Sequence, residues 1–477
     1  AQHVLTMFGA TVSVPLLFGP VMGMSAADTA KLISIVMLAS GVATLLQTTI
    51  GTRLPIVQGV SFAFLGTFFL IIGTAAEEAA AAGQPTGPLA MQYIAGAIIL
   101  GGLVEATIGF SGLIGAVRKI LSPVVIGPVI MLIGLALFGV GAPKAGTHWP
   151  IALLTIVLVI VFSLVLAKKK RFFRLFPILT AVIVVTTLCY ILTKAGVFPE
   201  GHPSAVSLAA ASDAPAFRLA PSELFFPWGW PKFNLGFFFA ILAAYLASMI
   251  ESVGDYHAIS YMSGAGDPTK KQLSRGIGAE GIGCIFTGVF GGFASTSYSE
   301  NIGLVGLTKV ASRYVVQIGG VILIVLGIFG KFGGFAAAIP GPVVGGLYCA
   351  LFGLISAIGV QQLAKADLSS DRNLFISGFS LFMGLSVPAY FAARASAEAL
   401  GPGLTLALYQ PTAEGMLAAL PATLGGIVGS IGSTGMAVAA IIGITLDNLV
   451  PGTPQERGIE GPSLLVPEAG DIGVGDD

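Results

Sequence analysis

The feature that most constrains this 477-residue chain is a series of long apolar runs, separated by shorter polar segments. A helix of about 20 apolar residues crosses the roughly 30 Å hydrocarbon core of a bilayer. Hydrophobic residues make up 55% of the chain and charged residues only 10%, whereas soluble proteins average about 25% charged residues. The sequence therefore predicts an all-α polytopic membrane protein that lies in a lipid bilayer. Fourteen candidate spans lie near residues 3–22, 29–50, 56–73, 90–110, 120–141, 150–168, 175–195, 234–256, 276–293, 298–311, 313–331, 337–361, 372–393 and 421–447.

Charge and histidine spacing exclude several classes of function. The 23 basic and 23 acidic residues give a net charge of zero, so electrostatics does not favour a nucleic-acid partner. The four histidines lack metal-ligand spacing, and no Gly-rich phosphate loop with Lys and Ser or Thr is present. We therefore expect no cofactor, no metal and no enzymatic activity.

Two of the candidate spans are irregular. The third, 56–73, is short and follows the segment 54–59, and the tenth contains the polar stretch Ser295–Thr308. In that stretch Ser297–Glu300 reads as extended, and the returning apolar spacing predicts a helix from about Asn301, with Asn301 as its N-cap. Polar, non-helical backbone is tolerated at membrane depth only where protein or a water-filled cavity satisfies it. The break in the tenth span therefore indicates a binding site.

The positions of the two breaks predict an internal repeat. Each irregular segment is third in a set of seven when the second set is counted from the polar segment 197–233. Because seven is odd, the halves must enter the membrane from opposite sides, which predicts two inverted 7-span repeats with the site between them. Most basic residues lie in loops that are cytoplasmic if the N-terminus is inside. We expect both termini to be cytoplasmic, in a plasma (inner) membrane.

Few ionisable residues fall inside the spans. Glu251 and Asp255 lie four residues apart, so both project from one helix face. Two carboxylates on one face are unfavourable in a bilayer unless they bind a proton, a cation or a polar substrate. The alternative is that this helix end is solvated at the interface. For Glu300 the alternative is a carboxylate that caps the half-helix, and for Glu280 and Glu105 a structural role is equally open.

One motif carries a family resemblance. Glu300-Asn301-Ile302-Gly303, followed by Thr308-Lys309, resembles the signature of the nucleobase-ascorbate transporter family, also called nucleobase:cation symporter-2. The first position of that signature is Gln, Glu or Pro, and every fixed position matches. Further similarity covers Gln2-His3, residues 61–64 and residues 251–256, so the resemblance spans nearly the whole chain.

The resemblance implies fourteen spans in two inverted repeats, with short strands in broken spans 3 and 10. It implies a core domain (1–116 and 234–332), a gate domain (117–196 and 333–450), an extracellular loop (197–233) and a cytoplasmic tail (451–477). The family also implies a homodimer formed through the gate domain.

Site residues follow from the same resemblance. Glu251 and Glu300 would bind the substrate through their carboxylates, while Phe62, Ser61 and Ser299 would contribute backbone contacts and packing. A second set would support ion coupling and the surrounding network: Asp255, His3, Glu280, Asn301 and Thr308.

The side chain at the first position of the signature, Glu300, ranks the candidate substrates. A carboxylate at Glu300 accepts from ring N–H groups, and uracil offers two, whereas the ascorbate anion would be repelled. We expect proton-coupled symport of a nucleobase into the cell, uracil first and then xanthine or another purine base. The alternative is a sodium-coupled ascorbate or nucleobase symporter, because residues around 251–256 and 371–375 look closer to the ascorbate branch. A channel or a membrane-embedded enzyme is a remote alternative.

Overall fold

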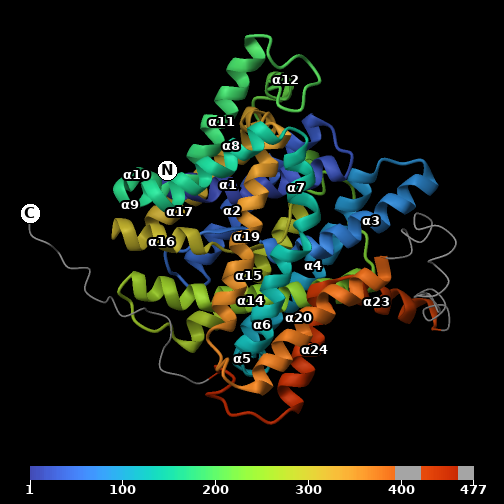
Figure 1. Ribbon diagram of the computed structural model, residues 1–477, viewed down its shortest axis with the longest axis vertical. Coiled ribbons are helices and arrows are strands. Elements are labelled where there is room, and N and C mark those ends of the chain that lie inside the picture. The colour runs from blue at the N-terminus through green and yellow to red at the C-terminus, as the bar shows by residue number, and fades with distance from the viewer. Residues whose placement is uncertain (393–419, 460–477) are drawn as a thin grey trace, which may run out of the picture.

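The computed structural model of the chain describes residues 1–392 and 420–459 (Figure 1). Long helices dominate this part of the chain, and two three-residue strands lie among them. The predicted gate segment 333–450 is thus described except for 393–419, and the predicted tail only as far as residue 459. An all-α polytopic fold with strands only at two breaks is confirmed.

The first half of the chain contains one strand and a series of helices up to residue 194. The elements are α1 (Gln2–Val21), α2 (Ala26–Thr49), β1 (Gln58–Val60), the 3₁₀ turn η1 (Phe62–Phe64), α3 (Leu65–Ala82), α4 (Thr86–Ser111), α5 (Ile114–Ile120), α6 (Pro123–Ala136), α7 (Phe138–Gly146), α8 (Trp149–Ile160), the π-helix η2 (Val161–Leu166), α9 (Ala167–Lys169), α10 (Arg171–Leu175) and α11 (Pro177–Lys194).

The second half begins with two short helices in the polar segment 197–233. The elements are α12 (Ala209–Asp213), α13 (Pro221–Leu224), α14 (Leu235–Met262), α15 (Lys270–Phe290), β2 (Ser295–Ser297), α16 (Ser299–Thr308), α17 (Arg313–Ile328), α18 (Gly330–Ala337), α19 (Gly341–Leu363), α20 (Asp371–Ala392), α23 (Ala422–Gly432) and α24 (Gly435–Leu449).

Ten helices among the described residues are long and apolar enough to cross a membrane, or eleven if the bent pair Thr423–Gly432 and Gly435–Leu449 counts as one span. The predicted count of fourteen is not confirmed. Three of the predicted spans fall short for physical reasons: α15 is only weakly apolar because it contains Glu280 and several glycines, while α16 and α17 are only 10 and 16 residues long.

Local sequence explains where the helices around the site begin and end. Asn234 caps α14 by accepting a hydrogen bond from the Phe237 amide (3.2 Å), and Thr269 and Gln272 form a capping box at the start of α15. Gly291 adopts a left-handed conformation (φ 74°) and ends α15. That sharp ending turns the chain into β2.

The helices pack in two main groups. α15 packs along α4 and α2, and α17 packs along α2. In the second group α19 packs on α6, α7 and α8, and α20 packs on α6 and α24. Since α14 contacts α4 as well as α23 and α24, the division into core and gate domains stays a prediction.

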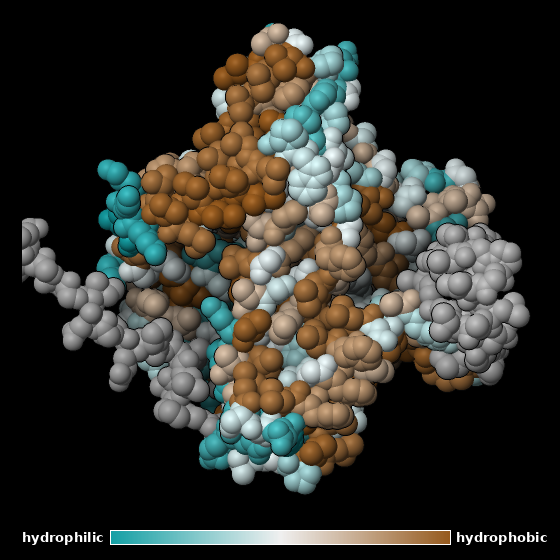
Figure 2. Space-filling view, viewed as in Figure 1, coloured by the Kyte–Doolittle hydropathy of each residue, from teal (hydrophilic) through white to brown (hydrophobic). Residues whose placement is uncertain are grey.

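Large apolar areas lie on the surface, as expected of a membrane protein. Figure 2 shows broad apolar areas where α8 and α11 lie in Figure 1, with polar side chains gathered toward the edges of the molecule. Large apolar side chains on these helices are exposed, among them Leu153, Val157, Ile183 and Ile191. Such continuous exposure of apolar side chains is stable in lipid and unfavourable in water.

Candidate substrate and ion site

The two breaks in the membrane helices meet as a pair of strands. β1 and β2 run antiparallel, with Gln58 opposite Ser297 and Val60 opposite Ser295. The ladder continues at both ends, because the Ser61 amide donates to the Ala294 carbonyl (2.9 Å) and the Tyr298 amide donates to the Val57 carbonyl (3.0 Å). Backbone groups that the helices leave unpaired are therefore satisfied inside the protein, as the membrane interior requires.

Each strand leads directly into a helix, so two helix N-termini lie beside the strand pair. Phe62 begins η1 and α3, and Ser299 begins α16. The first N–H groups of a helix have no partner within it and carry a partial positive charge. Polar groups of a ligand can bind there without a charged side chain.

Gly59 and Tyr298 fix how closely the strands approach. A Cβ atom at Gly59 would collide with the Tyr298 ring. The Tyr298 hydroxyl donates to the Val60 carbonyl (3.0 Å) and accepts from Thr11 of α1 (3.0 Å). The ring therefore packs directly against Gly59 of β1, and only glycine leaves room for it.

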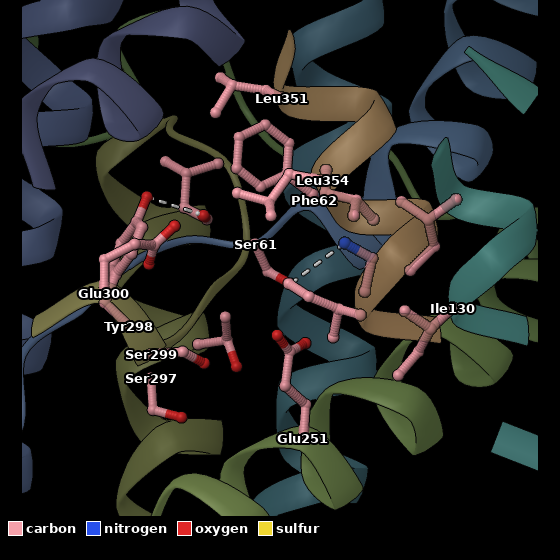
Figure 3. Close-up of a pocket in the computed structure, with 16 residues that line it drawn as sticks. Ser61, Phe62, Ile130, Glu251, Ser297, Tyr298, Ser299, Glu300, Leu351 and Leu354 are labelled. Carbon is pink, nitrogen blue, oxygen red and sulfur yellow. Dashed lines mark hydrogen bonds between the residues drawn. The ribbon is translucent and has the colours of Figure 1, made fainter. Parts of the chain in front are cut away.

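A cavity of about 270 Å³ opens beside the strand pair (Figure 3). One wall is apolar and comes from α6 and α19, with Ile130, Ile133, Leu351 and Leu354 among its residues. The opposite side is formed by residues 60–63 and 296–300, and Glu251 of α14 enters between these two sides. The cavity thus combines an apolar wall with a polar edge.

All five residues predicted to bind substrate line this cavity: Glu251, Glu300, Phe62, Ser61 and Ser299. In Figure 3 the carboxylate of Glu251 points into the cavity, and Glu300 lies on another side of it. Neither carboxylate is hydrogen-bonded to another side chain in the described part of the chain, and no basic side chain is among the lining residues described. Their roles toward a ligand stay predictions.

Two of the predicted residues already have internal partners. The Ser61 hydroxyl accepts from the Ala63 amide (3.3 Å), and the Ser299 hydroxyl donates to Asp255 Oδ1 (2.8 Å). Their side chains therefore stabilise the two helix starts. Their backbones remain beside the cavity, and a contact between these backbones and a ligand stays a prediction.

Asp255 and Glu280 belong to one buried network. Asp255 Oδ2 accepts from the Ser297 hydroxyl (2.7 Å). Glu280 accepts from Tyr256 (2.7 Å) on one oxygen, and its other oxygen receives three hydroxyl contacts. These come from Ser252 (2.8 Å), Thr296 (3.0 Å) and Ser248 (3.3 Å). Glu280, which appeared isolated in the sequence, is thus the most heavily hydrogen-bonded carboxylate near the site.

The prediction that Asn301 is the N-cap of the half-helix is wrong. α16 begins at Ser299, two residues earlier, so Asn301 lies within its first turn. The Asn301 amide donates to the His3 carbonyl (3.0 Å) and lies 3.1 Å from His3 Nδ1. Asn301 therefore connects α16 to α1, because its side chain bonds to His3 of the neighbouring helix and not to the first turn of its own.

Thr308 lies at the end of the half-helix, and its predicted part in the network around the site stays a prediction. Its hydroxyl donates to the Leu304 carbonyl (2.8 Å) within α16. The helix ends directly afterwards, with Lys309 in a left-handed conformation (φ 58°). Thr308 thus satisfies a carbonyl near the end of the half-helix.

Several residues of the network were missed in the sequence. Ser248, Ser252 and Tyr256 recur every four residues and form a second polar stripe on α14, next to the face of Glu251 and Asp255. That spacing could have been found. Gln47 could not, because its amide reaches the Tyr256 hydroxyl (2.5 Å) from α2, more than 200 residues away.

A multi-span helical protein in which two broken helices meet beside a cavity with a polar edge has the architecture typical of a secondary transporter. The chain belongs to the Permease family, whose profile matches residues 1–393, and its relatives are nucleobase-ascorbate transporters and members of solute carrier family 23. The family resemblance found in the sequence is thereby confirmed, and the enzyme alternative is excluded.

Two relatives illustrate the similarity. Solute carrier family 23 member 2 of Rattus norvegicus is 37% identical over 495 residues, covering 96% of this chain and 73% of the relative. Nucleobase-ascorbate transporter 1 of Arabidopsis thaliana is 37% identical over 440 residues, covering 90% of this chain and 84% of the relative.

Solved structures support the fold alone. The transmembrane domain of a cyanobacterium bicarbonate transporter, BicA, aligns with a TM-score of 0.50 at 17% identity, over 79% of this chain and 92% of that one. SLC26A9 aligns with a TM-score of 0.51 at 13% identity, over 80% of this chain and 61% of that one.

Proposed function

We propose that this transporter carries a neutral nucleobase into the cell by alternating access, with uracil as the first candidate and xanthine or another purine base next. The cavity supports this: two carboxylates face it and no basic side chain is among its described lining residues. Carboxylates accept hydrogen bonds, and uracil offers two ring N–H donors on a flat ring. The apolar wall of α6 and α19 suits the face of such a ring.

We propose that the coupling ion is a proton, and a count of hydroxyl protons supports it. Asp255, Ser297, Ser252 and Glu280 form a chain with oxygen separations of 2.7, 2.9 and 2.8 Å. Three short contacts need three protons, but the two serines supply only two. A third proton on either carboxyl group completes the chain. Asp255 and Glu280 would therefore share one proton through the two serines.

Transport in proteoliposomes tests both parts of the proposal. Uptake of labelled uracil, xanthine and ascorbate is measured under an imposed proton gradient and, separately, under an imposed sodium gradient at symmetrical pH. We expect saturable uracil uptake that follows the proton gradient and collapses when the gradient is dissipated. Uptake that follows sodium and ignores the proton gradient would contradict proton coupling, and a preference for ascorbate would contradict the substrate.

Ser252→Ala isolates the hydroxyl chain, and Ser248→Ala is its matched control. Both serines lie on α14 and contact Glu280 and Thr296, but only Ser252 contacts Ser297. We expect Ser252→Ala to lose uphill uptake while keeping substrate exchange, and Ser248→Ala to keep both. Equal behaviour of the two variants would contradict the shared-proton chain without affecting the choice of substrate.

Sodium-coupled transport of ascorbate or of a nucleobase is the second candidate. A relative at 37% identity is named nucleobase-ascorbate transporter 1, so its name includes both substrates. Asp255, Ser297 and Ser299 also gather carboxylate and hydroxyl oxygens, which are ligands that hard cations accept. The sodium arm of the transport assay distinguishes this candidate.

We further propose the arrangement in the membrane: a plasma membrane location, both termini cytoplasmic, and a homodimer formed through the gate domain. A core domain that moves relative to the bilayer works best against a fixed partner, and symmetric dimers are the commonest oligomers. Cysteine crosslinks between subunits should form between gate spans such as α20 or α24. Efficient crosslinks between core spans instead would contradict this dimer.

A further inference from the structure

Glu105 lies behind the substrate site, at the contact between α4 and α15. Glycines bring these helices unusually close: a Cβ atom at Gly102 would lie 2.8 Å from the Gly281 carbonyl oxygen, and one at Gly281 would collide with the Ala106 amide nitrogen. Glu105 precedes Ala106 and Glu280 precedes Gly281, so the two glutamates lie on facing segments within electrostatic range of each other. Small residues at such contacts allow close approach of membrane helices.

The Glu105 carboxyl group has no hydrogen-bond partner among the described residues. Its side chain is buried, with 1% of its surface exposed, and both oxygens lack a donor. Two possible donors lie nearby and are directed elsewhere. The Cys284 thiol donates to the Ser295 carbonyl (3.2 Å), and the Tyr245 hydroxyl donates to the Ile98 carbonyl (2.8 Å).

Glu280 has the opposite surroundings. Four hydroxyl groups, from Ser248, Ser252, Tyr256 and Thr296, lie within hydrogen-bonding distance of its two oxygens. Hydrogen bonds of this kind stabilise a carboxylate anion, whereas a buried carboxylate without any donor is strongly unfavourable. Two adjacent anions in a medium of low dielectric constant add repulsion to that cost. Of these two glutamates, Glu280 is therefore the one whose surroundings can hold a negative charge, and Glu105 is the one that favours the neutral form.

We propose that Glu105 is a second proton-binding site, in which a neutral carboxylic acid on α4 faces Glu280 on α15, the glutamate whose hydroxyl partners can stabilise a negative charge. The ligand of this site is a proton, and Glu105 is its only binding group. The groups that face it from the neighbouring helices are Glu280 and Cys284 on α15 and Tyr245 and Tyr256 on α14. None of them is a cation that could offset a charge on Glu105.

The Glu105 site is connected to β2, one of the two strands beside the cavity. Thr296 lies in β2 and contacts Glu280. A movement of β2 would remove or add the hydrogen bond from Thr296 to Glu280. The free energy of a negative charge on Glu280 would change, and the proton affinity of Glu105 would change with it. This connection concerns protons and the strand only, so the inference does not depend on which substrate the cavity binds.

Infrared difference spectroscopy of the purified full chain at neutral pH tests the protonation state. The spectrum of Glu105→Gln is subtracted from that of the unmodified protein. We expect the loss of one carboxylic-acid C=O band, shifted in D₂O, without loss of a carboxylate band. Glu78→Gln is the control, because Glu78 is exposed and paired with Lys232 (3.1 Å), and this variant should lose carboxylate bands instead.

Three results would overturn the proposal. The first is loss of a carboxylate band in Glu105→Gln, which would mean that Glu105 is ionised. The second is conversion of the acid band into a carboxylate band when sodium is added at constant pH, which would make this a cation site. The third is failure of Glu105→Gln to fold, because an amide has the size and neutrality of the protonated acid and should be tolerated.

Discussion

The two breaks in the membrane helices share one geometry and differ in chemistry. Both consist of a three-residue strand followed at once by a helix N-terminus. Yet the first break, residues 54–62, supplies mostly apolar side chains and glycine, while every residue from Ser295 to Glu300 carries a hydroxyl or carboxyl group. The first break thus provides backbone and packing surface, and the second provides the polar groups.

This difference shows that the two breaks contribute to the site in different ways, the first through close backbone approach and the second through hydrogen bonding. Close backbone approach requires a small residue in the first break, and Gly59, which packs against the Tyr298 ring, supplies it. Hydrogen bonding to Asp255 and Glu280 requires hydroxyl groups on the other side, and Ser297, Ser299 and Thr296 supply those. Changes in the first break should therefore act through geometry, and changes in the second through chemistry.

Gly59→Ala should have the largest effect. The added methyl group collides with the Tyr298 ring, so the strands must separate, at a cost of about 3 kcal/mol. We expect roughly a hundredfold weaker substrate binding by calorimetry, with a lowered melting temperature. Gly73→Ala is the control, because a Cβ atom at Gly73 of α3 meets open space. If Gly59→Ala binds substrate normally, close strand approach does not shape the site.

Glu300→Gln tests the chemistry of the second break. The change keeps the size of the side chain but replaces an acceptor oxygen with a donor, which should weaken uracil binding by about 1.5–3 kcal/mol. Relative affinity should move toward purine bases. Calorimetry with uracil and xanthine measures both effects, and unchanged uracil affinity would remove Glu300 from the binding site.

Tyr298→Phe affects the connection between the two breaks. It removes the hydrogen bonds to the Val60 carbonyl and from Thr11 but keeps the ring against Gly59. We expect a loss of about 0.5–1.5 kcal/mol in stability, seen as a lower melting temperature, with transport retained. A loss as large as that of Gly59→Ala would show that the hydroxyl group, and not the shape of the ring, sets the strand spacing.

Thr308→Ala should have the smallest effect. The hydroxyl of Thr308 donates to the Leu304 carbonyl (2.8 Å) and accepts from the Val310 amide (3.4 Å), both near the end of its own helix. Its removal should change stability by no more than about 0.5 kcal/mol and leave uracil affinity unchanged. A strong transport defect would instead support the part in the site network that the family resemblance implies for Thr308.

Much of the site could be predicted from sequence because its parts are local. The polar stretch Ser295–Thr308 identified the second break, and the spacing of Glu251 and Asp255 placed both on one helix face. The start of α16 was missed by two residues because Asn301, a good N-cap residue by type, bonds to His3 of α1 instead. The preference of Asn for N-cap positions was overridden there by a contact with a residue almost 300 positions away in the sequence.

Apolar run length and the scarcity of charge determined by themselves that this chain crosses a membrane, because lipid tolerates few charged side chains and demands paired backbone groups. The signature around Glu300 determined the family. Only the tertiary structure decided that Gly59 meets Tyr298, that four hydroxyl groups surround Glu280, and that Glu105 faces it without a donor. These contacts join helices distant in sequence, and whether a buried carboxyl group is hydrogen-bonded depends on such neighbours, which no local pattern records.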